Sequence, residues 1–294
     1  MDRQEAERLV NEIRDIPSPT EEEIFLYTDA LNYLIEKTGK PEWMMELGGY
    51  YYEEKRFDLA LKYYEMAAAK NDTSAFCCLG YIWYYGRTGQ KDYKKAFECF
   101  SKAMNRGDTV AAYKVADMYK NGYAVEKDYE RYKMIIERLY IRLKRDNFRR
   151  GPVSDVLTRY ARIRADEGKI DEAVSTYKTA KEYLAGRLEW NGFFGDRNVM
   201  KWMIGDMYKI TKPDMDNLDL YDLYYLLTKP WKGYIVTTDE KIAIESVIEG
   251  EACVIRYGDK WFRDTDDFFA RAEIYGERIT AHYYDISVYE DADR

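Results

Sequence analysis

The chain of 294 residues contains one histidine, four cysteines and six prolines, and it has no long apolar run free of charged residues. A membrane-spanning helix needs roughly 20 apolar residues, and the polar start, with Asp2, Arg3 and Glu5, lacks the apolar core of a signal peptide. These absences predict a cytoplasmic protein. Apolar residues make up 46% of the sequence, which is enough to bury a sizeable core.

The cysteines are too few and too irregularly spaced for a disulfide framework, a redox motif or a metal centre. Cys77 and Cys78 are adjacent, Cys99 and Cys253 stand alone, and no pair has the C-x-x-C spacing. We therefore expect all four to be small buried apolar side chains, and we expect neither a metal nor a cofactor.

The scarcity of histidine argues against catalysis. His282 is the only one; it falls in a segment that predicts a strand, and no second histidine, paired cysteine or nucleophile motif accompanies it. A calcium loop starting at Asp264 is excluded because its twelfth position is Tyr275, where a glutamate is needed. The sequence therefore predicts no catalytic residue and a protein that is not an enzyme.

Negative charge is concentrated near the C-terminus. The net charge is -8, and the residues from Thr237 onward include fifteen acidic and seven basic side chains, so the rest of the chain is neutral. Binding to nucleic acid needs a basic surface that neutralises phosphates. We therefore expect no nucleic-acid partner, and we expect the C-terminal part to be a separate unit.

The strongest positive signal is a repeated spacing, in which an alanine is followed by an aromatic residue four positions later and by a second alanine three positions after that. The first two copies are 36 residues apart, a period typical of stacked helix pairs that bury their apolar faces only against one another. The three copies are Ala60/Tyr64/Ala67, Ala96/Phe100/Ala103 and Ala173/Tyr177/Ala180.

The helix before each of the first two copies carries a large residue followed by glycine, as in Leu47-Gly48 and Leu79-Gly80. Glycine inside a helix costs about 1 kcal/mol relative to alanine. We therefore expect Gly48 and Gly80 to allow close approach of a neighbouring helix.

The second repeat resembles the Sel1-like repeat family, a subtype of the tetratricopeptide repeat. The resemblance rests on Ala75, Leu79, Gly80, Trp83, Gly86, Asp92, Ala96, Phe100, Ala103 and Gly107, and it extends over residues 41 to about 130. Residues 153–188 are more similar to an ordinary tetratricopeptide pair, and the composition resembles that of bacterial repeat proteins. The resemblance implies a mainly α fold: an α-solenoid of stacked antiparallel helix pairs that binds other proteins.

We expect three regions. Residues 1–40 form N-terminal capping helices, with Ser18 as the N-cap of the second helix and Glu21 completing a capping box. Residues 41–229 form the repeat array with its capping helices, interrupted at residues 191–196. Residues 230–294 form a small acidic α+β unit of three or four strands, with a hairpin turn at Gly258-Asp259.

In related arrays the first helix of each pair lines the concave groove. The face opposite the packed positions carries Met45, Gly49 and Cys77 together with aromatic and charged residues that suit a peptide. The alternative is that the tyrosines pack against adjacent helices. The candidate partner-binding residues are Tyr52, Tyr81, Tyr84, Tyr113, Asp117 and Lys120.

These observations predict a non-catalytic scaffold or adaptor that holds a peptide or protein in the concave groove and associates with no membrane. The alternative is an enzyme or regulatory protein whose C-terminal α+β unit acts on a substrate recruited by the repeats. A third option is self-association through an open strand edge of the C-terminal unit.

Overall fold

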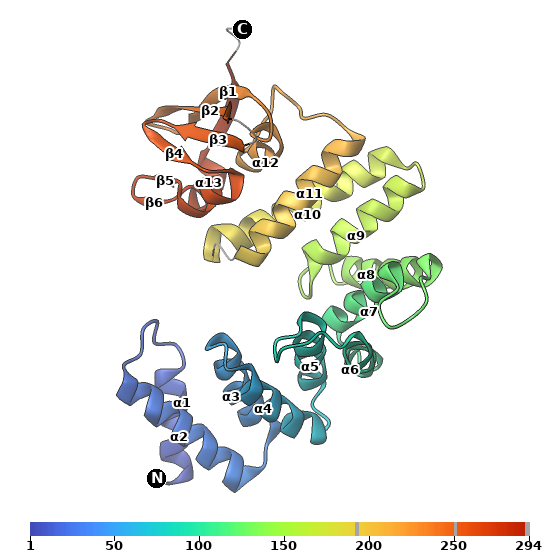
Figure 1. The fold of residues 1–294 in the computed structure, drawn as a ribbon, viewed down its shortest axis with the longest axis vertical. Helices are drawn as coiled ribbons and strands as arrows, with labels where there is room; N and C mark the ends of the chain where they lie inside the picture. Colours follow the sequence, from blue (N-terminus) through green and yellow to red (C-terminus); the bar gives the residue numbers. More distant parts are fainter. Residues whose placement is uncertain (192–193, 250–251, 292–294) are drawn as a thin grey trace. The chain divides into compact units, whose positions relative to one another are not determined.

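The computed structural model describes residues 1–191, 194–249 and 252–291, so the predicted interruption at residues 191–196 falls partly outside the described residues. The chain forms two compact units (Figure 1): unit 1 spans Met1–Leu139 and unit 2 spans Tyr140–Arg294. The predicted division into residues 1–40, 41–229 and 230–294 stays a prediction.

Unit 1 begins with two helices, α1 (Arg3–Ile13) and α2 (Glu21–Thr38). The predicted cap of the second helix was wrong by two residues: Thr20 is the N-cap, and it forms a capping box with Glu23. With Thr20 as the cap, three glutamates occupy the first turn of α2. Their negative charges stabilise the helix by interacting with the positive end of its dipole. Gly39 closes α2 in the left-handed conformation.

Antiparallel helix pairs follow in unit 1, and the last helix continues into unit 2. Asp72 and Asp108 cap two of the first helices by accepting the backbone N–H three residues later, at 2.8 and 2.7 Å. Gly86 and Gly122 end these helices with positive φ. The pairs are α3 (Pro41–Glu53) with α4 (Phe57–Ala69), α5 (Thr73–Tyr85) with α6 (Tyr93–Asn105), and α7 (Thr109–Asn121) with α8 (Tyr129–Arg145).

The glycines of the first helices lie against the aromatic residues of the repeated spacing. A methyl group added at Gly48 would lie 2.7 Å from the Tyr64 ring, and one added at Gly80 would lie 2.5 Å from the Phe100 ring. Both rings are buried, as are the alanines of the motif. The prediction that glycine permits close helix packing is confirmed.

The first helices of unit 1 form one row, α3, α5 and α7, and we call it the first-helix row. Figure 1 shows α3 and α5 on one side of unit 1, with α4 and α6 on the other. Within the row, α5 contacts α7 directly. The residues predicted to form a groove therefore come from neighbouring helices.

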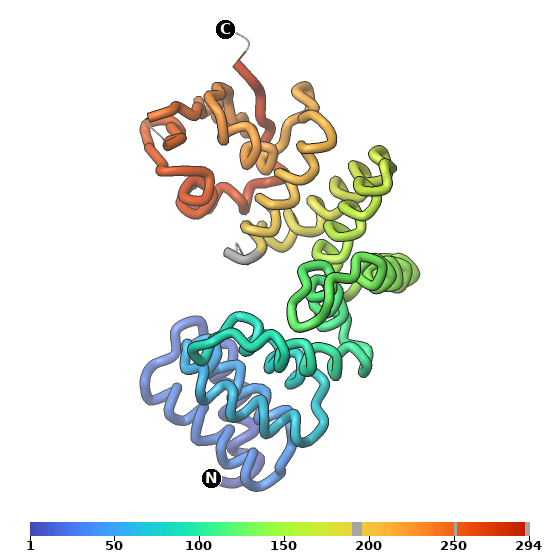
Figure 2. The backbone as a smooth tube through the Cα atoms, turned by 45° about the vertical axis from the view of Figure 1, so that its right-hand side comes forward, coloured from blue at the N-terminus to red at the C-terminus, as the bar shows by residue number. Residues whose placement is uncertain are grey.

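Unit 2 continues with α9 (Val153–Asp166), α10 (Ile170–Asn191) and α11 (Phe194–Ile210), which follow one another as a stack of helices (Figure 2). Ala173, Tyr177 and Ala180 are buried, which confirms the predicted helix pair at residues 153–188. The predicted capping region ends in a 3-10 turn, η1 (Leu220–Asp222), joined to a single α turn, α12 (Leu223–Leu226).

The chain then forms an antiparallel sheet with strand order β4-β3-β2-β1-β7 and a separate two-stranded ribbon, β5-β6. This is more than the three or four strands predicted, whereas the predicted turn at Gly258-Asp259 is confirmed between β3 and β4. Asp264 caps α13 (Thr265–Arg271) by accepting a hydrogen bond from the backbone N–H of Asp267 at 2.8 Å. The strands are β1 (Trp231–Val236), β2 (Lys241–Glu249), β3 (Ala252–Tyr257), β4 (Lys260–Phe262), β5 (Glu273–Ile274), β6 (Glu277–Arg278) and β7 (Ser287–Glu290).

The prediction that His282 lies in a strand was wrong. Ile279–Asp285 forms a 3-10 segment, η2, which contains His282, and only Ser287–Glu290 pairs with the sheet. Ile279 and Thr280 are buried, and η2 packs against α10. Packing against a helix has overridden the β propensity of the β-branched and aromatic residues. The sheet shares one hydrophobic core with α9–α12.

Candidate functional site

The first-helix row carries a connected set of tyrosines. The hydroxyl groups of Tyr81 on α5 and Tyr113 on α7 lie 3.3 Å apart, so they form a hydrogen bond between neighbouring helices. The Tyr81 ring also meets Phe100 edge-on, with centroids 5.3 Å apart. Tyr81 is thus fixed at its ring and at its hydroxyl while part of it stays accessible.

Tyr84 and Tyr85 extend this set toward the end of α5. Tyr85 is 44% exposed and packs edge-on against Tyr84, with centroids 5.1 Å apart. Tyr84 is half-buried, also against Tyr93 and Tyr123. Burial raises the pKa of Tyr84, and the nearby charge of Asp117 raises it further, so the phenol stays neutral.

Lys114 on α7 lies among these rings. Its Nζ atom is 5.1 Å from the Tyr81 ring centroid, 5.6 Å from Tyr84, 5.9 Å from Tyr85 and 5.4 Å from Tyr113. An ammonium group at such distances is attracted by the ring faces. Lys114 therefore holds the tyrosines of two helices together.

Arg87 links the same set to α3. Its Nε donates a hydrogen bond to the Tyr52 hydroxyl at 3.2 Å, and its guanidinium lies 5.2 Å from the Tyr85 ring centroid and 5.4 Å from that of Phe57. Tyr52 is half-buried against Phe57, with centroids 5.3 Å apart. One chain of contacts therefore runs from α3 through α5 to α7.

The six predicted residues fall into different environments. Tyr52, Tyr81 and Tyr84 are half-buried in the connected set, whereas Tyr113 is 6% exposed and acts mainly as a support for Tyr81. Asp117 and Lys120 are half-buried, and the Nζ atom of Lys120 lies 5.1 Å from the ring centroid of Tyr132 on α8. The sequence analysis did not identify Tyr85, Arg87 or Lys114. Tyr85 and Lys114 directly follow the predicted residues Tyr84 and Tyr113, whereas Arg87 adjoins no predicted residue.

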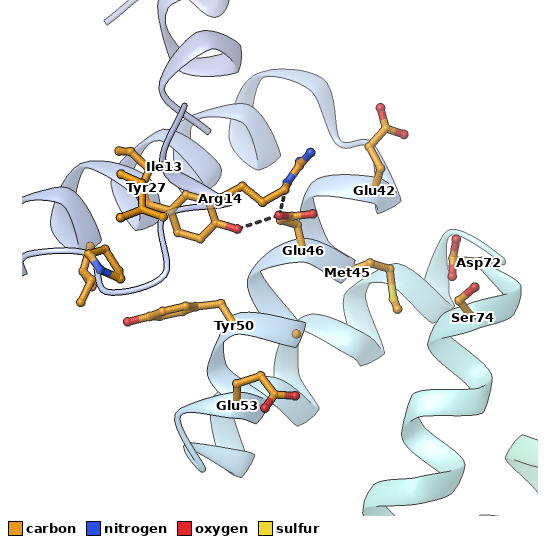
Figure 3. A pocket seen from close by; sticks show the side chains of 14 residues that line it. Ile13, Arg14, Tyr27, Glu42, Met45, Glu46, Tyr50, Glu53, Asp72 and Ser74 are labelled. Atoms are coloured by element: carbon orange, nitrogen blue, oxygen red, sulfur yellow. Dashed lines mark hydrogen bonds and ion pairs between the residues drawn. The ribbon is translucent and has the colours of Figure 1, made fainter. Parts of the chain in front are cut away.

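A hollow of about 710 Å³ adjoins α3 in unit 1 (Figure 3). The segment between α1 and α2, parts of α2 and α3, and the start of α5 form its walls. Met45 and Gly49, two positions of the predicted groove face, line it together with Tyr50. The hollow and the tyrosines thus share the same row of helices.

The hollow has a polar centre and acidic surroundings. Glu46 accepts hydrogen bonds from Arg14 Nε and from the Tyr27 hydroxyl, both at 2.7 Å (Figure 3). Burial, followed by the hydrogen bond to Glu46, raises the pKa of Tyr27. Arg14 neutralises Glu46, and Lys40 pairs with Glu42 at 2.8 Å, so the excess of negative charge at the hollow comes from Glu53 and Asp72.

Gly49 opens this hollow. A methyl group added there would meet no atom within 4 Å, in contrast to Gly48. Glycine inside a helix lowers stability by about 1 kcal/mol relative to alanine. Close packing does not account for a glycine at this position. Its absent side chain leaves room for a group from outside.

Unit 2 contains a buried polar cluster beside a smaller hollow of about 250 Å³. Lys181 is paired with Asp219, and it donates to Asp222 at 3.2 Å; Asp222 also accepts from the Tyr208 hydroxyl at 2.6 Å. Burial raises the pKa of Asp219, while Lys181 opposes the rise. These groups link α10 and α11 to η1.

The cluster does not include His282, the single histidine of the sequence. His282 lies outside the lining of the 250 Å³ hollow, and its Nε2 is 3.5 Å from Glu277 Oε2. Within residues 1–191, 194–249 and 252–291, no group of three or more histidine, cysteine, aspartate or glutamate side chains is placed to hold a metal ion. No helix in the described part of the chain has the length and apolarity needed to cross a membrane.

The cysteines differ partly from expectation. Only Cys77 is buried, whereas Cys78, Cys99 and Cys253 are half-buried, and all four are free thiols. Burial raises the pKa of Cys77 well above its ordinary value and that of Cys78 to about 11. Neither thiol is therefore a ready nucleophile at neutral pH.

Solved structures with a similar fold were found for this chain, whereas comparisons of its sequence found no match. No protein-family model and no curated protein matches the sequence. The crystal structure of a Sel1 repeat protein from Oxalobacter formigenes aligns with a TM-score of 0.52 at 21% identity, over 73% of this chain and 83% of that one. The antigen c5321 of uropathogenic Escherichia coli, which displays an SLR fold, aligns with a TM-score of 0.50 at 16% identity, over 72% of this chain and 44% of that one. The chain is therefore an α-solenoid with the Sel1-like repeat fold, followed by a small antiparallel sheet.

Proposed function

We propose that the protein is a cytoplasmic, non-catalytic scaffold that binds a peptide segment of another protein along the first-helix row of unit 1. The observation that carries this proposal is Gly49: it opens a hollow of about 710 Å³ without any packing reason, beside the aromatic set of α3, α5 and α7. A side chain of the partner fills the space that Gly49 leaves.

The tyrosines supply the contact area. Tyr81 and Tyr84 are held in place by their neighbours, and Tyr85 is largely accessible beside them. Rings that are already fixed lose little side-chain freedom on binding, so most of the burial energy contributes to affinity. Tyr52 contacts the partner between the hollow and Tyr85, and Tyr113 supports Tyr81.

The charges set the direction of the peptide. Glu53 and Asp72 at the hollow favour a basic residue with an aliphatic stem, which would also pack against Met45 and Tyr50. Asp117 and Lys120 provide polar contacts on α7. Because both signs are present along the row, binding is only mildly sensitive to salt.

The proposal is tested with a peptide library displayed on phage and selected on the full chain. We expect the enriched peptides to bind at least tenfold more weakly when Gly49→Leu fills the hollow or when Tyr85→Ala removes the most exposed ring. The matched controls are Gly186→Leu, where an added side chain also meets open space, and Tyr129→Ala on α8. Equal loss of affinity in the variants and their controls would refute the groove.

A further inference from the structure

Unit 2 carries an exposed tryptophan that its own packing does not use. Trp202 on α11 is 63% exposed. Gly205, Asp206 and Lys209 follow at spacings of three, four and seven residues, so all four positions lie on one face of the helix. A solvated tryptophan on such a face is the residue type most enriched at the energetic centre of protein interfaces.

A hollow of about 360 Å³ lies beside Trp202, and Gly205 opens it. A methyl group added at Gly205 would meet no atom within 4 Å, so packing does not require the glycine. Tyr224, Tyr225 and Thr228 form other parts of the lining. The hollow has room for one aromatic or branched aliphatic side chain, with the indole of Trp202 as one wall.

A second hollow of about 410 Å³ is lined by Tyr225 as well, so the two hollows adjoin at this residue. The Nζ atom of Lys229 lies 5.2 Å from the Tyr225 ring centroid. Lys212 and the half-exposed Met215 also line the second hollow. The surface thus consists of two adjoining hollows that are lined by apolar and lysine side chains.

Positive charge prevails on this surface although the whole chain is acidic. Five cations line the two hollows, Arg162, Lys201, Lys209, Lys212 and Lys229, against two carboxylates, Asp206 and Glu290. Lys201 also pairs with Asp266 at 2.7 Å, so Lys212 and Lys229 supply most of the excess positive charge. Arg162 and Lys209 both pair with Asp206, so this carboxylate offers little attraction to a further cation. A partner with negative charge is therefore favoured at this surface.

We propose that the surface formed by Trp202, Gly205, Lys209, Lys212, Tyr225 and Lys229 binds an acidic peptide segment, with one apolar side chain of that segment seated beside Gly205. Nucleic acid fits less well, because the net charge of -8 repels a dense line of phosphates beyond this local patch. The surface belongs to unit 2 and does not depend on the first-helix row.

The test selects displayed peptides on the full chain and on Trp202→Ala, and compares the two sets of sequences. Peptides that need Trp202 are expected to contain aspartate or glutamate around one aromatic or aliphatic residue. Trp261→Ala is the matched control, because Trp261 is a similarly exposed tryptophan of the same unit, at 53%. Selected peptides that depend on Trp202 but lack acidic residues would overturn the proposal, and so would a failure to find any that depend on it.

Titration of one selected peptide, carrying a fluorescent label, then separates the parts of the surface. Gly205→Leu and the pair Lys212→Glu with Lys229→Glu are each expected to weaken binding by about tenfold or more, while Gly186→Leu and Gly49→Leu leave it unchanged. A labelled single-stranded RNA is titrated in parallel. RNA binding that is lost in Trp202→Ala, or peptide binding that is indifferent to Gly205→Leu, would contradict the assignment.

Discussion

Gly48 and Gly49 are neighbours in α3, yet an added methyl group would lie 2.7 Å from the Tyr64 ring at Gly48 and would meet no atom within 4 Å at Gly49. The same residue type serves close helix packing at one position and leaves an open hollow at the next. This contrast separates the residues that build the repeat from those that are available to a partner.

The two glycines are expected to respond in opposite ways to substitution by alanine. Gly48→Ala destabilises the protein by about 1–2 kcal/mol, because the clash with Tyr64 exceeds the gain in helix propensity. Gly49→Ala raises the free energy of unfolding by up to about 1 kcal/mol, because it gains propensity without a clash. Urea titration measures both values. Equal effects at the two positions would contradict the structural contrast.

Lys114→Met is expected to lower the free energy of unfolding by about 1–2 kcal/mol, because the ammonium group no longer bridges four tyrosine rings on α5 and α7. Lys94→Met, at an exposed position of α6, is the control and is expected to change stability by less than about 0.5 kcal/mol. The comparison is made by urea titration. If both variants were equally stable, the contacts of Lys114 would be incidental.

Lys181→Met is expected to destabilise unit 2 by about 3–5 kcal/mol, because it leaves the carboxylates of Asp219 and Asp222 buried without their cation. Lys178→Met, one turn earlier on α10 and exposed, should have little effect. Thermal unfolding followed by circular dichroism distinguishes the two. If Lys181→Met unfolded at the same temperature as the native protein, the prediction would be wrong, and water would have to solvate the carboxylates of this cluster.

Asp267 predicts a pH dependence of stability. The hydrogen bond from Arg271 holds the pKa of Asp267 well below its ordinary value, despite the opposing effect of burial. Because the folded pKa lies below the unfolded value of about 3.9, this contribution to stability is present above about pH 4 and is lost as the pH falls further. Asp267→Asn should therefore cost about 2 kcal/mol at pH 7 and progressively less below about pH 4.

Urea titrations between neutral pH and about pH 2.5 test this expectation. Asp266→Asn is the control, because its ion pair with Lys201 lies at the surface and contributes at most about 1 kcal/mol. A stability difference between the native protein and Asp267→Asn that stays constant over the whole pH range would be incompatible with a lowered pKa.

The repeat helices were predictable from sequence because their packing uses small and aromatic residues at fixed spacing, as Gly80 and Phe100 show. Local rules were insufficient at the start of α2, where Ser18 with Glu21 and Thr20 with Glu23 both fit a capping box. They also failed at Ile279–Asp285, where contact with α10, distant in sequence, decides the conformation.

The candidate site was predictable only in part. Periodicity identified the helix face that holds Tyr52 and Tyr81, but it did not show that Tyr113 supports Tyr81 from beneath. Lys114 and Arg87 were missed because their long side chains reach rings on other helices. The hollow at Gly49 could not be predicted from sequence either, because one of its walls is the segment between α1 and α2, which is distant from Gly49 in the sequence.

In the proposed complex a peptide lies along the first-helix row with one side chain in the hollow at Gly49. The most direct measurement places a photo-reactive group on the anchor residue of a peptide selected on the full chain, and identifies the crosslinked position by mass spectrometry. We expect crosslinks to Met45, Tyr50 and neighbouring residues of α3. Crosslinks confined to α4, α6 or unit 2 would contradict this binding mode.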